Sequence, residues 1–120
     1  MEITVWYLST CSTCQRIIKE AGLDGDHVRL IDIKSHPVSE NELEGIYHAI
    51  GSYKDLINGR STQFRTMNKK ANELSEEEAR KLLLQHYAFL KRPVIRIGHQ
   101  YYVGNSKNVV EALKSRLNHG

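Results

Sequence analysis

Residues 3–16 have the sequence ITVWYLSTCSTCQR, in which a short apolar run is followed by Cys11 and Cys14. The run is rich in β-branched and aromatic residues, as is typical of a buried strand. The residues from about Ser12 to Ala21 predict a helix that Gly22 ends. A C-x-x-C motif therefore lies where a first strand passes into a first helix, and the N–H groups and dipole of a helix start stabilise a thiolate. The motif predicts a reactive sulfur.

Cys11 and Cys14 are the only cysteines, so the only disulfide possible within one chain joins them. Such a bond closes about one helical turn, whereas a structural disulfide stabilises a protein by closing a long loop. The pair is therefore interpreted as a redox centre. A zinc half-site and two inert, half-buried cysteines are the alternatives. No metal site is predicted, because the six histidines include no pair at the spacing of roughly three to five residues found in zinc sites.

Length and composition predict one domain over residues 1–120, built around one core. The chain opens with Met1-Glu2, unlike a signal peptide, and no stretch approaches the ~18 apolar residues of a membrane span. We therefore expect a cytoplasmic protein, in which disulfides are mostly transient or catalytic. The net charge is +3, from 17 Lys and Arg against 14 Asp and Glu. This excess is too small and too scattered to indicate nucleic-acid binding.

Three further strands are predicted, at residues 28–33, 94–97 and 100–103, and the last two form a hairpin. Asn105 or Ser106 is expected to cap a final helix. A strand–helix–strand opening implies a right-handed parallel pair, and the hairpin adds an antiparallel edge. This order predicts an α/β, thioredoxin-like domain with a four-stranded mixed sheet flanked by helices.

Residues 36–91, approximately, are predicted to form a helical insertion between the second and third strands. Two capping boxes, each a serine followed three residues later by a glutamate, mark helix starts within it: Ser39 with Glu42 and Ser75 with Glu78. Gly51 is expected to end the first of these helices. The apolar spacing of the second helix extends through Tyr87 to Leu90.

Two regions carry arginines of the kind that bind anions. Arg60 and Arg65 lie in a polar stretch, and guanidinium groups hold oxyanions by paired hydrogen bonds. Solvated surface charge is the alternative interpretation of these two residues. Arg92 precedes Pro93 at the start of the third predicted strand, a position where proline is tolerated.

Three ordered motifs resemble the ArsC family, and together they span nearly the whole chain: Cys11 to Cys14, residues 56–65 and residues 90–95, with Val103-Gly104 following the hairpin. That family contains the glutaredoxin-coupled arsenate reductases, the Spx transcription regulators and the YffB-type thiol reductases. The resemblance implies a thioredoxin-like fold and thiol–disulfide chemistry.

The resemblance to the arsenate reductases implies that Cys11 is the catalytic nucleophile and that Arg92 assists catalysis. It further implies that the substrate is bound by Arg60, Arg92 and Pro93. It also implies a cis bond before Pro93, which faces Cys11. Two departures stand out: the typical reductase has serine where this chain has Cys14, and an arginine expected after the hairpin is replaced near Gly104. We therefore expect a reductase in which Cys11 attacks a glutathione mixed disulfide, or an oxyanion such as arsenate, and Cys14 resolves the adduct. No cofactor is expected to stay bound; glutathione, glutaredoxin or thioredoxin would supply electrons.

The C-x-x-C motif also resembles Spx, which implies a second function. In that alternative, the chain is a redox-sensing transcription regulator that binds the α subunit of RNA polymerase and makes no direct contact with nucleic acid. Gly51 lies near the place where Spx carries a contact glycine, and a helix-ending glycine is the other explanation for this residue.

Overall fold

The computed structural model describes residues 2–119, which divide into two compact units. The first unit comprises residues 2–34 and 92–119, and the second is Ser35–Lys91. The second unit is thus inserted in the sequence of the first, between its second and third strands. That the chain acts as one domain stays a prediction.

The first unit contains the predicted four-stranded mixed sheet, with strand order β2-β1-β3-β4. Its strands are β1 (Ile3–Tyr7), β2 (Val28–Asp32), β3 (Val94–Ile97) and β4 (Gln100–Val103). β1 pairs in parallel with β2 and antiparallel with β3, and β3 pairs antiparallel with β4. The predicted mixed sheet is therefore confirmed.

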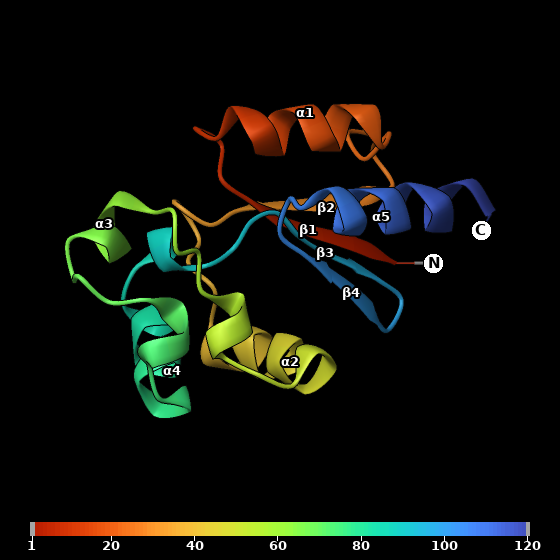
Figure 1. Ribbon diagram of the computed structural model, residues 1–120. Coiled ribbons are helices and arrows are strands. Elements are labelled where there is room, and N and C mark those ends of the chain that lie inside the picture. The colour runs from red at the N-terminus through yellow and green to blue at the C-terminus, as the bar shows by residue number, and fades with distance from the viewer. Residues whose placement is uncertain (1, 120) are drawn as a thin grey trace. The chain divides into compact units, whose positions relative to one another are not determined.

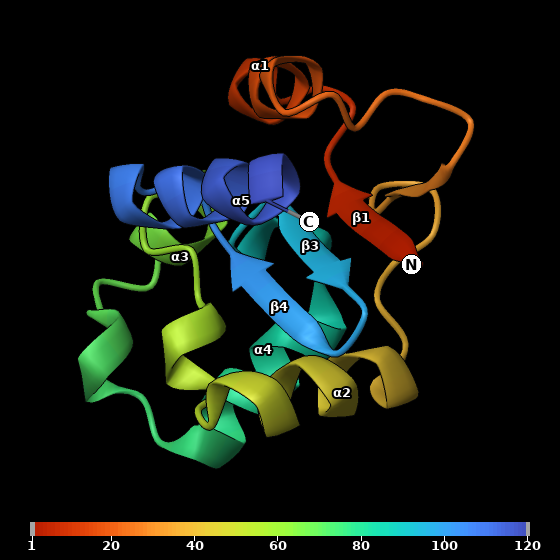
Figure 2. The same cartoon turned by 90° about the vertical axis from the view of Figure 1, so that its right-hand side faces the viewer.

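Two helices, α1 (Ser12–Glu20) and α5 (Lys107–His119), cover one face of this sheet (Figures 1 and 2). Alternate residues of a strand point to opposite faces, so one apolar row of each strand meets the helices. The core of this unit consists of these buried side chains: Val5, Ile17, Ile18, Leu23, Val28, Ile95, Ile97 and Leu113. Ser106 begins α5, since its hydroxyl accepts a hydrogen bond from the N–H of Val109 at 3.3 Å. The sequence predicts either Asn105 or Ser106 as the cap of this helix, and the structure shows that it is Ser106.

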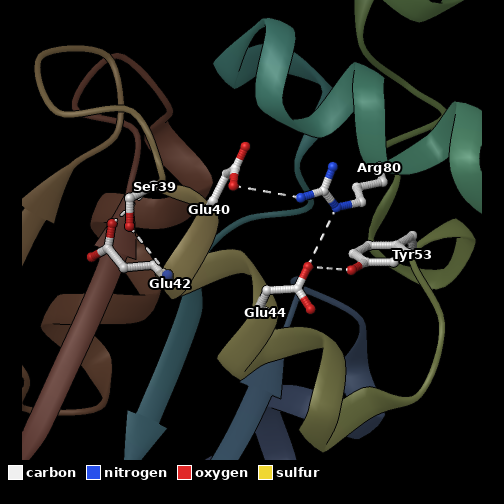
Figure 3. Close-up of polar contacts among 6 residues, drawn as sticks. All are labelled: Ser39, Glu40, Glu42, Glu44, Tyr53 and Arg80. Carbon is white, nitrogen blue, oxygen red and sulfur yellow. Dashed lines mark hydrogen bonds and ion pairs between the residues drawn. The ribbon is translucent and has the colours of Figure 1, made fainter.

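The second unit is helical. Its α-helices are α2 (Glu40–Ile50), α3 (Thr62–Arg65) and α4 (Glu76–Gln85), and its short 3₁₀ helices are η1 (Lys54–Leu56), η2 (Ala71–Glu73) and η3 (Tyr87–Phe89). Both predicted capping boxes are present. In the first, the Ser39 hydroxyl accepts from the Glu42 N–H at 3.1 Å, and the Glu42 carboxylate accepts from the Ser39 N–H at 2.9 Å (Figure 3). Gly51 ends α2 in the left-handed conformation, with φ of 90°.

The predicted continuation of α4 to Leu90 is wrong. The helix ends at Gln85, and His86 takes an extended conformation with φ of −154° and ψ of 138°. Its Nδ1 atom accepts a hydrogen bond from the N–H of Ala88 at 3.0 Å, which starts η3 instead of a further α-helical turn. The imidazole of His86 thus accepts from an N–H that a continued helix would bond to a backbone carbonyl. Local side-chain acceptors are known to compete with helical hydrogen bonds in this way.

A polar network ties α2, the segment after it and α4 together within the second unit. The Tyr53 hydroxyl donates to the Glu44 carboxylate at 2.5 Å, and Arg80 Nε donates to the same oxygen at 3.3 Å (Figure 3). Arg80 also lies 3.7 Å from the carboxylate of Glu40. The carboxylate of Glu76 accepts from the N–H groups of Tyr53 and Lys54 and from the Ser52 hydroxyl, at 2.7, 3.1 and 3.0 Å. These bonds fix the segment between α2 and η1.

Candidate active site

Cys11 lies at the junction between the loop after β1 and the start of α1. β1 ends at Tyr7, and a turn follows in which the Cys11 N–H donates to the Leu8 carbonyl at 3.0 Å. Cys11 is the N-cap of α1, with an extended backbone, and its side chain is partly exposed. Cys14 lies within the first turn of the helix and is completely buried. Both thiols are free, and only Cys11 is open to an incoming molecule.

The surroundings of Cys11 favour its thiolate. Burial alone raises the pKa of the Cys11 thiol, but the N–H and S–H of Cys14, the charge of Arg92 and the N–H of Thr13 together bring this pKa below its ordinary value of 9.0. The sulfur makes no cap hydrogen bond of ordinary geometry, yet it is near enough to these N–H groups for their dipoles to act on it. Cys11 therefore has the character of a nucleophile.

Cys14 has the opposite character. Burial, and after it the charge of Cys11, raise the pKa of the Cys14 thiol to about 12, although a hydrogen bond with the Leu8 backbone and the charge of Arg92 act to lower it. A thiol with this pKa stays protonated near neutral pH and donates to its partner sulfur. The two cysteines are therefore close together, and their pKa values are shifted in opposite directions.

Arg92 and Pro93 lie just before β3, and the charge of Arg92 acts on the cysteines. The register places Val94 beside Trp6, so the beginning of β3 and the end of β1 lie at the same end of the sheet. The Arg92–Pro93 peptide bond is cis, as the resemblance had predicted, and Pro93 is buried. Its carbonyl accepts from the Gly104 N–H at 2.9 Å, which ties this corner to the end of β4. The charge of Arg92 acts on both sulfurs.

The contacts that hold the loop before Cys11 have no counterpart among the sequence motifs. The Asp32 carboxylate accepts from the N–H of Ser9 at 3.2 Å, and the Gln15 side-chain amide donates to the Ser9 carbonyl at 3.2 Å. Asp32 is the last residue of β2, and Gln15 lies on α1. The strand register, which brings Tyr7 beside Asp32, is what places this carboxylate at the loop.

Comparison with known proteins decides the family. Residues 6–113 match the model of the ArsC family. The chain belongs to the ArsC family. The predicted resemblance is thus confirmed, and with it the thioredoxin-like fold. No curated protein showed significant sequence similarity to the chain.

Solved structures support the fold of this ArsC-family chain. An arsenate reductase from Vibrio cholerae superposes with a TM-score of 0.76 at 16% identity, covering 94% of this chain and 98% of that one. An arsenate reductase (ArsC) related protein from Brucella melitensis gives 0.71 at 22% identity, covering 93% of each chain. A protein from Staphylococcus aureus gives 0.71 at 25% identity, covering 92% of this chain and 96% of that one.

The other ArsC-type residue predicted to bind substrate, Arg60, belongs to the second unit. Its side chain is exposed, and its N–H donates to the Asn58 side chain at 3.1 Å in the turn before α3. Arg65 is also exposed, at the end of α3. The assignment of Arg60 to substrate binding stays a prediction.

No group of three or more His, Cys, Asp or Glu side chains among residues 2–119 is arranged to hold a metal ion. Within the same range, no helix is both long enough and apolar enough to span a membrane.

Proposed function

We propose that this ArsC-family chain is a thiol–disulfide reductase with Cys11 as nucleophile and Cys14 as resolving cysteine. The observation that carries the proposal is the opposed state of the two sulfurs: Cys11 is accessible with a lowered pKa, and Cys14 is buried with its pKa raised to about 12. A reactive thiolate beside a protonated, hidden thiol suits a two-step exchange. In this proposal the two units act together as one domain. The protein works in the cytoplasm.

In the first step, the Cys11 thiolate attacks one sulfur of a mixed disulfide formed by glutathione. A bond forms between Cys11 and that sulfur, and the other sulfur leaves as a thiolate with the electron pair. In the second step, Cys14 loses its proton to the departing thiolate or to water and attacks the Cys11 sulfur. The disulfide between Cys11 and Cys14 forms, the second thiolate leaves, and the substrate has gained two electrons.

The order of these steps follows from the electrostatics. The charge on Cys11 contributes to the raised pKa of Cys14, after burial. Once Cys11 is in a mixed disulfide it has no charge, so the pKa of Cys14 falls and this thiol becomes a better nucleophile. Cys14 is thus activated by the formation of the adduct that it resolves. A dithiol protein of the thioredoxin or glutaredoxin type, or glutathione, returns the disulfide to two thiols.

Arg92 has two roles in this proposal. Its charge lowers the pKa of Cys11, after the opposing effect of burial and the hydrogen bonds from Cys14. It also provides a cation beside the reacting sulfur, which suits the carboxylates of glutathione or an oxyanion such as arsenate. Pro93 shapes the same corner, and Arg60 is the further substrate-binding arginine proposed.

The test is single-turnover kinetics of the reduced protein with a glutathione mixed disulfide and, separately, with arsenate. The wild type should convert one of them and end as the Cys11–Cys14 disulfide. Cys14→Ser should stop at an adduct on Cys11, identified by mass spectrometry, and Cys11→Ser should form no adduct. A wild type that reacts with neither compound, or an adduct on Cys14 first, contradicts the proposed reductase.

The same C-x-x-C pair supports a second candidate, the redox-sensing regulator. There the disulfide reports the oxidation state, and a helical surface binds the α subunit of RNA polymerase. A pull-down with purified α subunit, performed on reduced and oxidised protein, separates the two candidates. Redox-dependent capture without turnover supports the regulator, and turnover without capture supports the reductase.

A further inference from the structure

The loop that carries Cys11 is held from two sides at the backbone of one residue, Ser9. On one side, the Ser9 N–H donates to Asp32 Oδ1, and the same oxygen accepts from the Lys34 N–H, each at 3.2 Å. On the other side, the Ser9 carbonyl accepts from Gln15 Nε2 at 3.2 Å. The end of β2 and the second turn of α1 thus both hold the backbone just before the reactive cysteine.

This attachment matters because the pKa of Cys11 depends on where its sulfur lies. The N–H groups of Cys14 and Thr13 and the charge of Arg92 lower that pKa against the effect of burial, and each of these influences weakens with distance. Cys11 is the residue with extended backbone that joins the loop to the helix. A looser loop lets the sulfur leave the helix start and spend part of its time in water.

We propose that Asp32 and Gln15 are positioning residues, which fix the backbone N–H and carbonyl of Ser9 and thereby hold the Cys11 sulfur where its thiolate is stabilised. The inference rests on the proposed function, in which Cys11 is the nucleophile. Neither side chain touches the reacting atoms, and neither belongs to the motifs that resemble the ArsC family.

Asp32 has two opposite influences on Cys11, and two substitutions separate them. Its carboxylate is a hydrogen-bond acceptor for the loop, which favours the thiolate, and it is also a negative charge, which disfavours one. Asp32→Asn keeps an acceptor oxygen and removes the charge. Asp32→Ala removes both. The positioning role predicts that only the alanine variant raises the pKa of Cys11.

The experiment measures the rate of Cys11 alkylation by iodoacetamide against pH, in the full chain carrying Cys14→Ser. We expect Asp32→Ala, and separately Gln15→Leu, to raise the Cys11 pKa and slow alkylation at neutral pH about 3- to 10-fold, since one pKa unit is tenfold in thiolate. Asp32→Asn should keep the reference rate or exceed it. Asp24→Ala is the matched control, because Asp24 is exposed in the loop before β2 and should leave the rate unchanged.

Three results would overturn the inference. They are an unchanged pKa in both Asp32→Ala and Gln15→Leu, a lowered pKa in Asp32→Ala, or an equal rise in Asp32→Asn and Asp32→Ala. If the alanine variant does not fold, Gln15→Leu alone decides, with its fold checked by circular dichroism. The readout uses no substrate, so a protein that reduces nothing still tests the positioning role, and a reductase with an unaffected pKa refutes that role alone.

Discussion

Arg92 and Cys11, far apart in the sequence, lie at the same end of the sheet, where the guanidinium charge acts on the sulfur. Burial raises the pKa of the Cys11 thiol, and Arg92 is among the groups that bring it below its ordinary value. The antiparallel pairing of β1 with β3 creates this arrangement, since it sets the end of one strand beside the start of the other. The charge also acts on Cys14.

Arg92→Ala should raise the pKa of Cys11 and slow its alkylation at neutral pH by roughly 3- to 10-fold, because the thiolate loses a nearby cation. Arg92→Lys should recover part of the rate, since lysine restores the charge without the planar donor group. Arg65→Ala is the control, as Arg65 is exposed on α3. Equal slowing in the Arg92 and Arg65 alanine variants would argue against a specific effect of Arg92.

The two cysteines should differ in reactivity across the pH range. Cys11 ionises below pH 9.0, so its alkylation rate should level off before that of an ordinary thiol, whereas Cys14 stays protonated up to a pKa of about 12. Peptide mapping after brief treatment with iodoacetamide at neutral pH should therefore find the label on Cys11. Faster labelling of Cys14 would reverse the assigned roles.

Mild oxidation should join the cysteines without unfolding the chain. They lie within one helical turn, close enough for a bond of about 2.05 Å after small rotamer changes. Diamide should lower the free thiols from two to none per chain, and dithiothreitol should restore both, with little change in the far-ultraviolet circular dichroism. Two thiols that persist after diamide would show that the pair does not form this bond.

Glu76→Gln should destabilise the second unit by roughly 1–3 kcal/mol, because hydrogen bonds to a charged acceptor are lost or weakened at the segment after α2. The carboxylate accepts from Ser52, Tyr53 and Lys54. Urea unfolding provides the measurement. Glu77→Gln is the matched control: Glu77 is the neighbouring residue and forms an exposed ion pair with Lys81, so its loss should change stability little.

The effect of Glu76 should depend on pH. Burial raises the pKa of its carboxyl, but the hydrogen bonds from Tyr53, Lys54 and Ser52 bring it below the ordinary value of 4.5. A folded-state pKa below the unfolded one means that the stabilisation is complete above about pH 4.5 and is lost as pH falls through the folded-state pKa. The difference in unfolding free energy between wild type and Glu76→Gln should therefore shrink in acid. A difference that stays constant with pH would contradict this account.

Local signals in the sequence predicted much of the fold. Serine and glutamate at capping-box spacing predicted the starts of α2 and α4, and Gly51 predicted the end of α2, because these devices act within one turn. The end of α4 was misjudged, since the side chain of His86 competes for a backbone N–H that periodicity ignores.

For the candidate site, too, local features were predictable from the sequence and contacts between distant residues were not. The C-x-x-C motif indicated where a thiolate would be stabilised, because the helix start is a local feature. Asp32, Gln15 and the network of Tyr53 with Glu44 and Arg80 were not predicted. Strand register brings Asp32 to Ser9 and helix packing brings Arg80 to Glu44, while the bond from Gln15 to Ser9 depends on the path of the loop; the residue pattern along the chain encodes none of these.

The buried position of Cys14 gives the pair a chemical selectivity of its own. A molecule that modifies Cys11 removes the charge there, which lowers the barrier to attack by Cys14 on whatever the first sulfur now carries. Adducts joined through a sulfur or oxygen that can depart are cleared by the neighbouring thiol. A carbon adduct offers no such departing group, so alkylation is permanent. In the proposed mechanism, Cys14 thus reverses a mixed disulfide or a sulfenic acid on Cys11, whereas electrophilic carbon inactivates the protein.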